Sequence, residues 1–376
     1  MSGIYIHVPY CKHKCEYCDF YSVDTNEAKQ EFSDLLIREL SLRMSYLPSN
    51  RIETMYFGGG TPSLLSAMQV EEVLNAIAKQ FELAQNAEIT FEANPDDLDA
   101  EYLGALRQIG VNRLSIGVQS FSDSDLKALG RRHNAAQAVC AVNAAQEVGF
   151  NNISIDLIYG LPYSNTGIWH SNLMQAFNMQ VQHLSCYHLI YESGTPITRR
   201  LNSGFLQPAS EDQSVEQFKM LQEVSQQNGF VHYEISNLAK EGFISRHNSS
   251  YWKQIPYLGI GPSSHSFNGA TRDWNPRSIT KWKNSILKGS VAVDSEVLSL
   301  TDLVNDYILT SLRTIWGLDV DFIEKKLGVK ALNDFFKALR KYEKLGFVKV
   351  NRNEITIKPQ YFLLSDGIIA DLLFVT

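Results

Sequence analysis

The segment that decides the fold is residues 4–18, which read IYIHVPYCKHKCEYC. Its first part, Ile4–Val8, is largely apolar and β-branched, which predicts a short buried strand. The loop after this strand carries three cysteines in a Cys-x3-Cys-x2-Cys spacing: Cys11, Cys15 and Cys18. Three thiolates this close can hold an iron–sulfur cluster and leave one iron without a protein ligand. A structural zinc ion with His7 or His13 as fourth ligand fits the same spacing, so the loop alone leaves both metal centres open.

From this segment to about residue 230, short β-branched or aromatic runs alternate with amphipathic stretches. The expected strands are Ile4–Val8, Thr54–Phe57, Glu88–Phe91, Arg113–Val118, Ile153–Ile158 and Leu184–Ile190. The expected helices include Glu27–Ser45, Ser66–Phe81, Asp99–Ile109, Ala135–Val148 and Glu211–Gln227. This alternation predicts repeated βα units around a parallel sheet. Six units are too few for a closed eight-stranded barrel, so we expect an α/β fold with a partial (β/α)6 barrel over residues 1–230, open or completed by later segments.

Two further regions follow the expected barrel. Residues 231–300 are rich in Tyr, Trp, Ser, Gly and Pro and are interpreted as an irregular connecting region that packs against the barrel. Residues 301–376 resemble a winged helix in their order of elements: helices near Leu303–Ile315, Val320–Leu327 and Ala331–Leu345, strands Val348–Val350 and Glu354–Ile357, and a last helix from Tyr361. Winged helices often bind DNA, but Glu324, Asp334 and Glu343 dilute the basic residues here, so a smaller C-terminal packing domain is the preferred interpretation.

Composition narrows the class of protein. The 376 residues are 44% hydrophobic and carry a formal net charge of −7, which argues against a broad nucleic-acid-binding surface. The sequence has neither a basic stretch before an apolar run at its N-terminus nor a transmembrane segment of about 18 apolar residues, so we expect a cytoplasmic protein. Cys140 and Cys186 lie far from the cysteine loop in apolar-rich segments, a spacing unlike that of a disulfide framework. They are expected to be small buried hydrophobic residues, because free cysteines are commonly buried.

Unusual residues follow the expected strands at the end where βα barrels carry their chemistry. Gly58–Pro62 reads GGGTP, which either lets backbone groups approach a ligand or forms an ordinary tight turn. Three polar side chains at other strand ends need partners there: Glu92, Gln119 and Asp156. A ribose or an amino group of a ligand would satisfy them, and so would a salt bridge or a helix cap. Arg131 could bind a carboxylate or be a solvated arginine at a helix end.

The cysteine spacing after the first strand, with Tyr17 before the third cysteine, resembles the signature of the radical S-adenosylmethionine (SAM) superfamily. The resemblance implies a [4Fe–4S] cluster whose free iron takes the amino and carboxylate groups of SAM, and one-electron cleavage of SAM to a 5′-deoxyadenosyl radical. Gly58–Pro62 is similar to the motif that contacts the methionine part of SAM. Over nearly the full chain, the motifs resemble the oxygen-independent coproporphyrinogen III oxidase-like family. The cofactor contacts that this resemblance implies are Tyr5, Tyr17, Gly59, Gly60, Thr61, Glu92, Gln119, Arg131, Asp156 and Ile190.

Two features separate this chain from the decarboxylating oxidases of that family. The oxidases carry a fourth cysteine two residues after the third, where this chain has Phe20, and they have a longer segment than the ten residues before Cys11. Residues 247–252 read HNSSYW and resemble the His-Asn-x-x-Tyr-Trp motif of the heme chaperone branch (HemW-type). The resemblance implies heme binding, with His247 either as an iron ligand or as a hydrogen-bonded histidine without that role.

The expected function is therefore a radical SAM heme chaperone that binds a [4Fe–4S] cluster, SAM and heme. An oxygen-independent coproporphyrinogen III oxidase is the alternative, and an RNA-modifying radical SAM enzyme is a more distant one that the acidic balance disfavours. The partners that the resemblance implies are heme, a heme-acceptor protein and an electron donor such as a flavodoxin or a ferredoxin. The sequence identifies neither the acceptor nor the donor.

Overall fold

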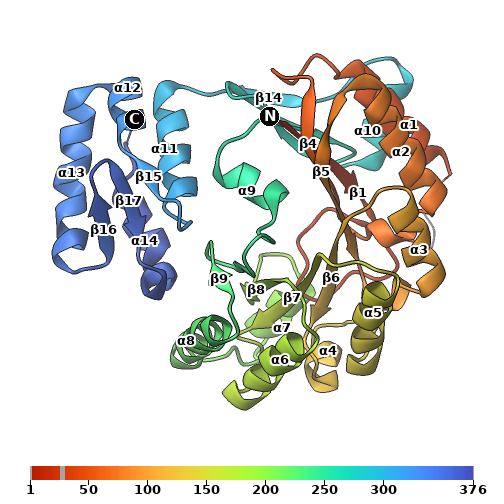
Figure 1. Cartoon of the computed structure of the whole chain (residues 1–376), viewed down its shortest axis with the longest axis horizontal. Helices are drawn as coiled ribbons and strands as arrows, with labels where there is room; N and C mark the ends of the chain where they lie inside the picture. The colour runs from red at the N-terminus through yellow and green to blue at the C-terminus, as the bar shows by residue number, and fades with distance from the viewer. Residues whose placement is uncertain (1, 26–29, 376) are drawn as a thin grey trace.

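The computed structural model describes residues 2–25 and 30–375. The six strands expected from the sequence lie parallel in one sheet, in chain order (Figure 1). They are β1 (Ser2–Val8), β4 (Arg51–Gly59), β5 (Glu82–Ala93), β6 (Arg113–Gln119), β7 (Ile153–Tyr159) and β8 (His183–His188). Each overlaps an expected run, and the prediction of an α/β partial barrel is confirmed.

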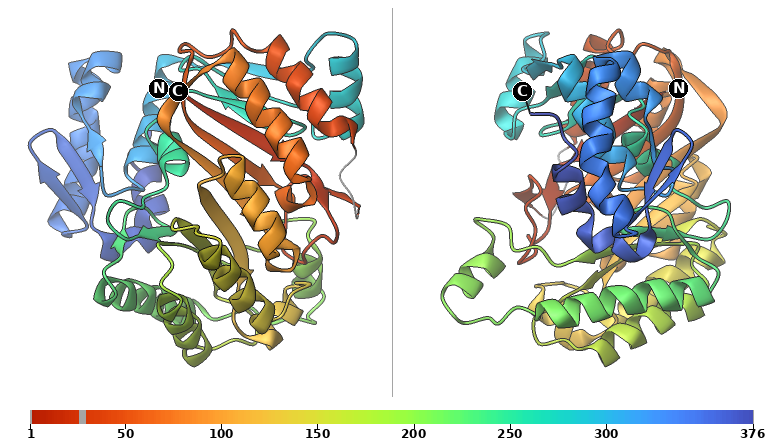
Figure 2. Two further views of the ribbon diagram at one scale, coloured as in Figure 1. Left: turned by 45° about the vertical axis from the view of Figure 1, so that its right-hand side comes forward. Right: turned by 90° about the vertical axis from the view of Figure 1, so that its left-hand side faces the viewer.

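Helices follow these strands and cover the outer face of the sheet, as α1, α2 and α3 do in Figure 2. The α-helices up to residue 230 are α1 (Glu31–Leu42), α2 (Ala67–Gln80), α3 (Ala100–Gln108), α4 (Asp123–Ala128), α5 (Ala135–Glu147), α6 (Thr166–Asn178), α7 (Pro196–Asn202) and α8 (Glu211–Gln227). Ser66 and Asn134 close capping boxes at α2 and α5, which fixes where these helices begin. The first expected helix, Glu27–Ser45, is observed from Glu31, and its residues 27–29 lie outside the described residues.

The region 231–300 is not an irregular connection, and this expectation is wrong. It extends the sheet at both edges, with β11 parallel to β1 and the neighbouring strands antiparallel, to give twelve strands. Its elements are β9 (Val231–His232), β10 (Asn237–Ala239), α9 (Arg246–Trp252), β11 (Tyr257–Ile260), β12 (His265–Phe267), β13 (Thr271–Trp274), α10 (Ile279–Leu287) and β14 (Asp294–Val297). Gly259 makes the β11–β12 turn possible, because a Cβ there would lie 2.1 Å from the backbone oxygen of His265.

The C-terminal part has the expected order of helices and strands. Its elements are α11 (Leu300–Ser311), β15 (Leu318–Asp319), α12 (Asp321–Leu327), α13 (Val329–Lys344), β16 (Val348–Asn351), β17 (Glu354–Ile357), a 3-10 helix (Pro359–Leu364) and α14 (Ser365–Ala370). The strands form a separate sheet in the order β15-β17-β16. A single cluster of buried apolar residues nevertheless runs from the barrel into this part, so the division into three regions stays a prediction.

The two faces of the main sheet differ in chemistry. On β6, Leu114, Ile116 and Val118 are fully buried in the apolar core under the helices, whereas Arg113 and Ser115 alternate with them toward the concave inner face. Helix α9 lies on this inner face, between the sheet and the C-terminal part (Figure 1). The inside of the barrel is therefore polar, and its buried polar groups require partners.

Two remaining expectations concern cysteines and membranes. Cys186 is buried in the core as expected, but Cys140 is exposed. The expectation for Cys140 is wrong because α5 turns Ala138, Ala141 and Val142 toward the core and leaves position 140 on the solvent side. Among the helices of the described residues, none combines the length and apolar character that spanning a bilayer would require.

Candidate functional site

The cysteine loop follows β1, where the short strands β2 (Tyr10–Cys11) and β3 (Val23–Asp24) pair in parallel. Cys11 is buried, and Cys15 and Cys18 are half-buried. Two side chains outside the loop reach its sulfur atoms: Thr61 Oγ1 lies 3.5 Å from Cys11 Sγ, and Arg131 Nη1 lies 3.2 Å from Cys15 Sγ. Hydrogen-bond donors beside the sulfurs suit thiolates that ligate an iron–sulfur cluster, so the chemistry of the loop fits that group.

His7, one of the two histidines considered as a fourth zinc ligand, already has a partner at each ring nitrogen. His7 Nε2 donates to the Tyr21 carbonyl oxygen at 3.1 Å, and its Nδ1 shares a 3.1 Å hydrogen bond with the Tyr5 hydroxyl. Burial lowers the pKa of His7 to about 4, so the ring is neutral and both nitrogens are engaged.

The glycine-rich turn packs tightly against the cysteine loop. Gly59 has φ +107°, and a Cβ there would lie 2.6 Å from the His7 ring. A Cβ at Gly60 would lie 2.7 Å from the backbone oxygen of Tyr10 and 2.8 Å from that of Val8. Protein atoms fill the space beside their Cα atoms, and the glycines allow the end of β4 to approach the cysteine loop.

Glu92 lies at the end of β5 and faces this turn. The Tyr56 hydroxyl donates to its Oε1 at 2.6 Å, and the Gly59 N–H lies 3.3 Å from its Oε2. Burial raises the pKa of Glu92 to about 7, while the bond from Tyr56 acts in the opposite direction. A carboxyl group poised in this range can accept hydrogen bonds as an anion near neutral pH.

Arg131 is not a solvated arginine. Its Nη2 donates to Asn94 Oδ1 at 2.6 Å and to the Gly117 carbonyl oxygen at 2.7 Å, while Nη1 reaches the Cys15 sulfur. Asn94 Nδ2 in turn lies 3.3 Å from Thr61 Oγ1. The network joins the ends of β4, β5 and β6 to the cysteine loop. Asn94, like Glu92, is one of the unusual residues that follow the third expected strand, but it was not among the cofactor contacts that the resemblance implies.

Asp156 and Tyr17 lie near the same network. Ser115 Oγ donates to Asp156 Oδ1 at 3.3 Å, and burial raises the pKa of Asp156 to about 6. Burial also raises the pKa of Tyr17, which interacts electrostatically with Arg131 and Asp156. Gln119 ends β6 with φ +67°, a backbone conformation that is strained for a residue with a side chain.

Ile190 is the expected contact that stands apart. It lies two residues beyond the end of β8 and is 63% exposed. The other nine expected SAM contacts lie at the cysteine loop, at the strand ends beside it or, for Tyr5 and Asp156, inside β1 and β7.

His247 lies on α9, deep on the inner face of the barrel. It is 1% exposed, its Nδ1 is 2.8 Å from Thr54 Oγ1, and its Nε2 is 2.9 Å from the Tyr251 hydroxyl. Its ring stacks on Tyr56 with centroids 5.0 Å apart, and burial lowers its pKa to about 3. A heme iron could reach the imidazole only after one of these two hydrogen bonds had broken.

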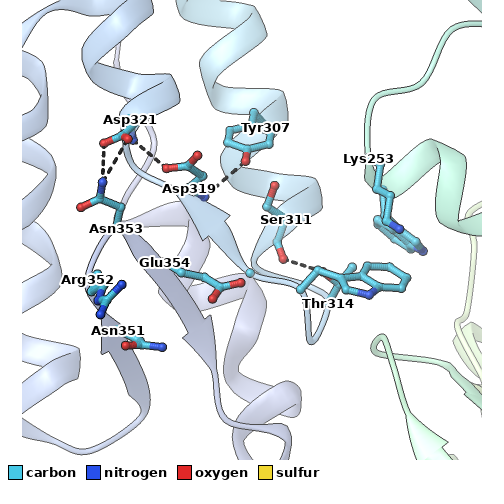
Figure 3. A pocket seen from close by; sticks show the side chains of 13 residues that line it. Lys253, Tyr307, Ser311, Thr314, Asp319, Asp321, Asn351, Arg352, Asn353 and Glu354 are labelled. Carbon is cyan, nitrogen blue, oxygen red and sulfur yellow. Dashed lines mark hydrogen bonds between the residues drawn. The ribbon is translucent and has the colours of Figure 1, made fainter.

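The end of α9 borders a cavity of about 710 Å³ between the barrel and the C-terminal part (Figure 3). Trp252, the last residue of the HNSSYW segment, lines it together with Trp316, and Lys253 Nζ lies 4.2 Å from the centre of the Trp316 ring. On the other wall, Asn353 Nδ2 bonds both carboxylate oxygens of Asp321. Sequence reasoning missed this cavity, because its walls come from segments that are distant along the chain.

Comparisons with known proteins agree with the observed fold. Residues 5–169 match the radical SAM superfamily. The heme chaperone HemW of Lactococcus lactis subsp. lactis is 35% identical over 86% of this chain and 85% of its own length. HemW of Bacillus subtilis is 30% identical over 99% of both chains. A bovine relative, the mitochondrial radical S-adenosyl methionine domain-containing protein 1, is 31% identical over 99% of this chain and 87% of its own.

A solved structure supports the architecture over the whole length. Coproporphyrinogen III oxidase (HemN) from Escherichia coli superposes with a TM-score of 0.85, covering 99% of this chain and 89% of that one. At 22% identity the likeness concerns the fold alone. The curated HemW relatives, matched over most of their length, identify the branch. The chain belongs to the radical SAM superfamily and, within it, to the HemW-type heme chaperone branch of the oxygen-independent coproporphyrinogen III oxidase-like family.

Proposed function

We propose that Cys11, Cys15 and Cys18 hold a [4Fe–4S] cluster and that SAM binds beside it at the strand ends. The observation that carries this proposal is the network through which Arg131 and Thr61 reach two of the three cysteine sulfurs. The same arginine bonds Asn94, which links the cysteine loop to the glycine-rich turn. Residues 5–169 match the radical SAM superfamily, whose members use a cluster and SAM. We therefore assign the contacts at the cysteine loop to these two groups.

The residues of this chain would orient SAM and hold charge. Arg131 and Thr61 would donate to the thiolate sulfurs, and Glu92 and Asp156, as carboxylates, would accept hydrogen bonds from hydroxyl or ammonium groups of SAM. Tyr17 packs beside a buried apolar cluster that includes Leu129, Ile158 and Leu161, and it would help to exclude water from the site. When bound, the reduced cluster would supply the electron that cleaves SAM.

The cargo in this proposal is heme, as the name of the HemW relatives states for those proteins. Residues 247–252 carry the motif that the heme chaperones share, and His247 is the proposed ligand after it leaves Thr54 or Tyr251. A heme-acceptor protein and an electron donor of the flavodoxin or ferredoxin class complete the proposed partners. The proposed compartment is the cytoplasm, whose reducing conditions keep cysteine thiols free.

Heme titration of the anaerobically purified, cluster-loaded protein tests this function. We expect a bound-heme absorption spectrum, and we expect it to change in His247→Ala because the imidazole ligand is lost. An unchanged spectrum and affinity in the variant would remove His247 as ligand. No heme binding by either protein would remove the chaperone function.

The alternative, an oxidase, is tested with the same preparation, SAM, a reductant and coproporphyrinogen III. Phe20 is 64% exposed at the position where the oxidases carry a fourth cysteine, so we expect no decarboxylation. Repeated turnover to protoporphyrinogen IX would establish the oxidase instead.

A further inference from the structure

Arg113 is buried inside the barrel without a partner. It is 1% exposed, and none of its Nε, Nη1 and Nη2 atoms has a hydrogen-bond partner within residues 2–25 and 30–375. Two less buried arginines differ. Arg43 donates to the Gly259 carbonyl oxygen at 3.1 Å and to Asp273 at 3.2 Å, and Arg131 has three partners. A buried, unpaired guanidinium is costly, so its position calls for an explanation.

Arg113 lies on the inner face of the sheet, so its positive charge lies inside the barrel. It begins β6, and on the same face Ser115 bonds Asp156. In the pairing with β5, Arg113 lies opposite Thr90, whose buried hydroxyl oxygen also has no partner among the described residues. Arg113 therefore lies on the inner face of the sheet, on the strand between the one that carries Glu92 and the one that carries Asp156.

The positive charge of Arg113 affects the pKa values of Glu92 and Asp156. Burial raises the pKa of both Glu92 and Asp156, and Arg113 acts against burial at each of them. The carboxyl groups also face each other, which raises the pKa of Glu92 further. The other ionisable or charged groups that interact with them are Tyr5 on β1, Tyr17 and Arg131 beside the cysteine loop, Tyr56 on β4, Cys186 and Tyr187 on β8 and Tyr251 on α9.

We propose that Arg113 is a positioning residue of the SAM site: its buried charge favours the anionic forms of Glu92 and Asp156, which accept hydrogen bonds from SAM. This inference rests on the proposed function, because it assumes that both carboxylates face bound SAM. The arginine itself lies too deep to be assigned a direct contact. Its role requires the positive charge, and the geometry of its five donors is secondary.

The test compares SAM binding by Arg113→Met and Arg113→Lys with the wild type. Binding is measured by titration calorimetry of the anaerobic, cluster-loaded proteins between pH 6 and pH 9. Removing a nearby opposite charge raises a carboxyl pKa by about one unit or more, and Arg113 is the last of the causes that act on Glu92, so in Arg113→Met the pH midpoint of binding should rise by about one unit. Affinity at pH 7 should then fall about fivefold and recover at pH 9. Arg113→Lys should keep the wild-type midpoint.

The control is Arg38→Met, which removes one charge from the exposed side of α1 and should change neither midpoint nor affinity. A folded Arg113→Met protein with the wild-type pH profile would overturn the inference, as would an Arg113→Lys profile shifted as far as that of Arg113→Met. If the wild type did not bind SAM at any pH, the proposed function would fail instead.

If Arg113→Met is too unstable for SAM titration, the thermal stability of a double variant provides a second test. Adding Glu92→Gln removes one of the carboxylates that would lack a counter-charge, so at pH 8 the double variant should melt at a higher temperature than Arg113→Met. A double variant that melts no higher would show that Arg113 does not act through this carboxylate.

Discussion

Two hydrogen bonds attach α9 to β5, and their strength predicts how far a substitution should lower the free energy of unfolding. Glu88 is buried on β5, and its carboxylate accepts the N–H groups of Arg246 and His247 at 3.0 and 2.9 Å, where α9 begins. Hydrogen bonds to a charged group contribute about 1.5–3 kcal/mol each and are not additive, so Glu88→Ala should lower the free energy of unfolding by about 2–4 kcal/mol. With an unfolding entropy of about 0.8 kcal/mol per kelvin for 376 residues, the melting temperature should fall by about 3–5 °C.

The assay is thermal unfolding of the SAM-free protein followed by circular dichroism. Glu53→Gln is the matched control, because Glu53 pairs with the side chain of the same Arg246 at 2.7 Å but is partly exposed. An exposed ion pair contributes about 0–1 kcal/mol, so this variant should melt within about 1 °C of the wild type. If Glu88→Ala melted as high as Glu53→Gln, the two bonds to α9 would not stabilise the fold in the way described.

Three further outcomes are expected. Replacing any one of the three loop cysteines by Ala should remove about four irons per chain from the reconstituted protein, whereas Cys140→Ala should keep them, as iron analysis will show. Tyr56→Phe removes a 2.6 Å bond that favours the Glu92 anion, so the pKa of Glu92 should rise from about 7 by about one to two units and the pH midpoint of SAM binding with it. Tyr102→Phe, which loses a bond to a backbone oxygen elsewhere, should leave that midpoint unchanged. Gly59→Ala should lower both cluster content and melting temperature, because a Cβ at φ +107° would meet an imidazole ring 2.6 Å away.

The parallel part of the fold was predictable because its strands are long apolar runs separated by capped amphipathic helices. Helix α6 (Thr166–Asn178) was missing from the expected helices, although Asn165 caps it in the ordinary way. The edge strands β11–β14 could not be found from periodicity, since each has only three or four residues. They pair because the chain folds back beside β1, which is a tertiary effect.

The candidate site was predictable where a polar residue ends an apolar strand, as at Glu92 and Gln119. It was not predictable inside the strands. Tyr56 and Arg113 were taken as ordinary strand residues, and only the alternation of faces in the folded sheet turns them toward the carboxylates. A polar residue on the inner face of a strand has no signal of its own in a single sequence, because the partner that explains it lies on another strand.

The role of residues 247–252 (HNSSYW) depends on tertiary contacts of helix α9, which the sequence alone does not predict. Its first turn is fixed to β5 through Glu88, His247 is bonded to β4 through Thr54, and Trp252 at its other end borders the cavity shared with the C-terminal part. A histidine held in this way is a structural residue of the barrel as long as both of its hydrogen bonds persist. If it also binds heme iron, ligand binding must compete with these bonds, and heme affinity should rise when Thr54 can no longer hold the ring. Heme binding and the attachment of α9 to the sheet would then be coupled through one imidazole.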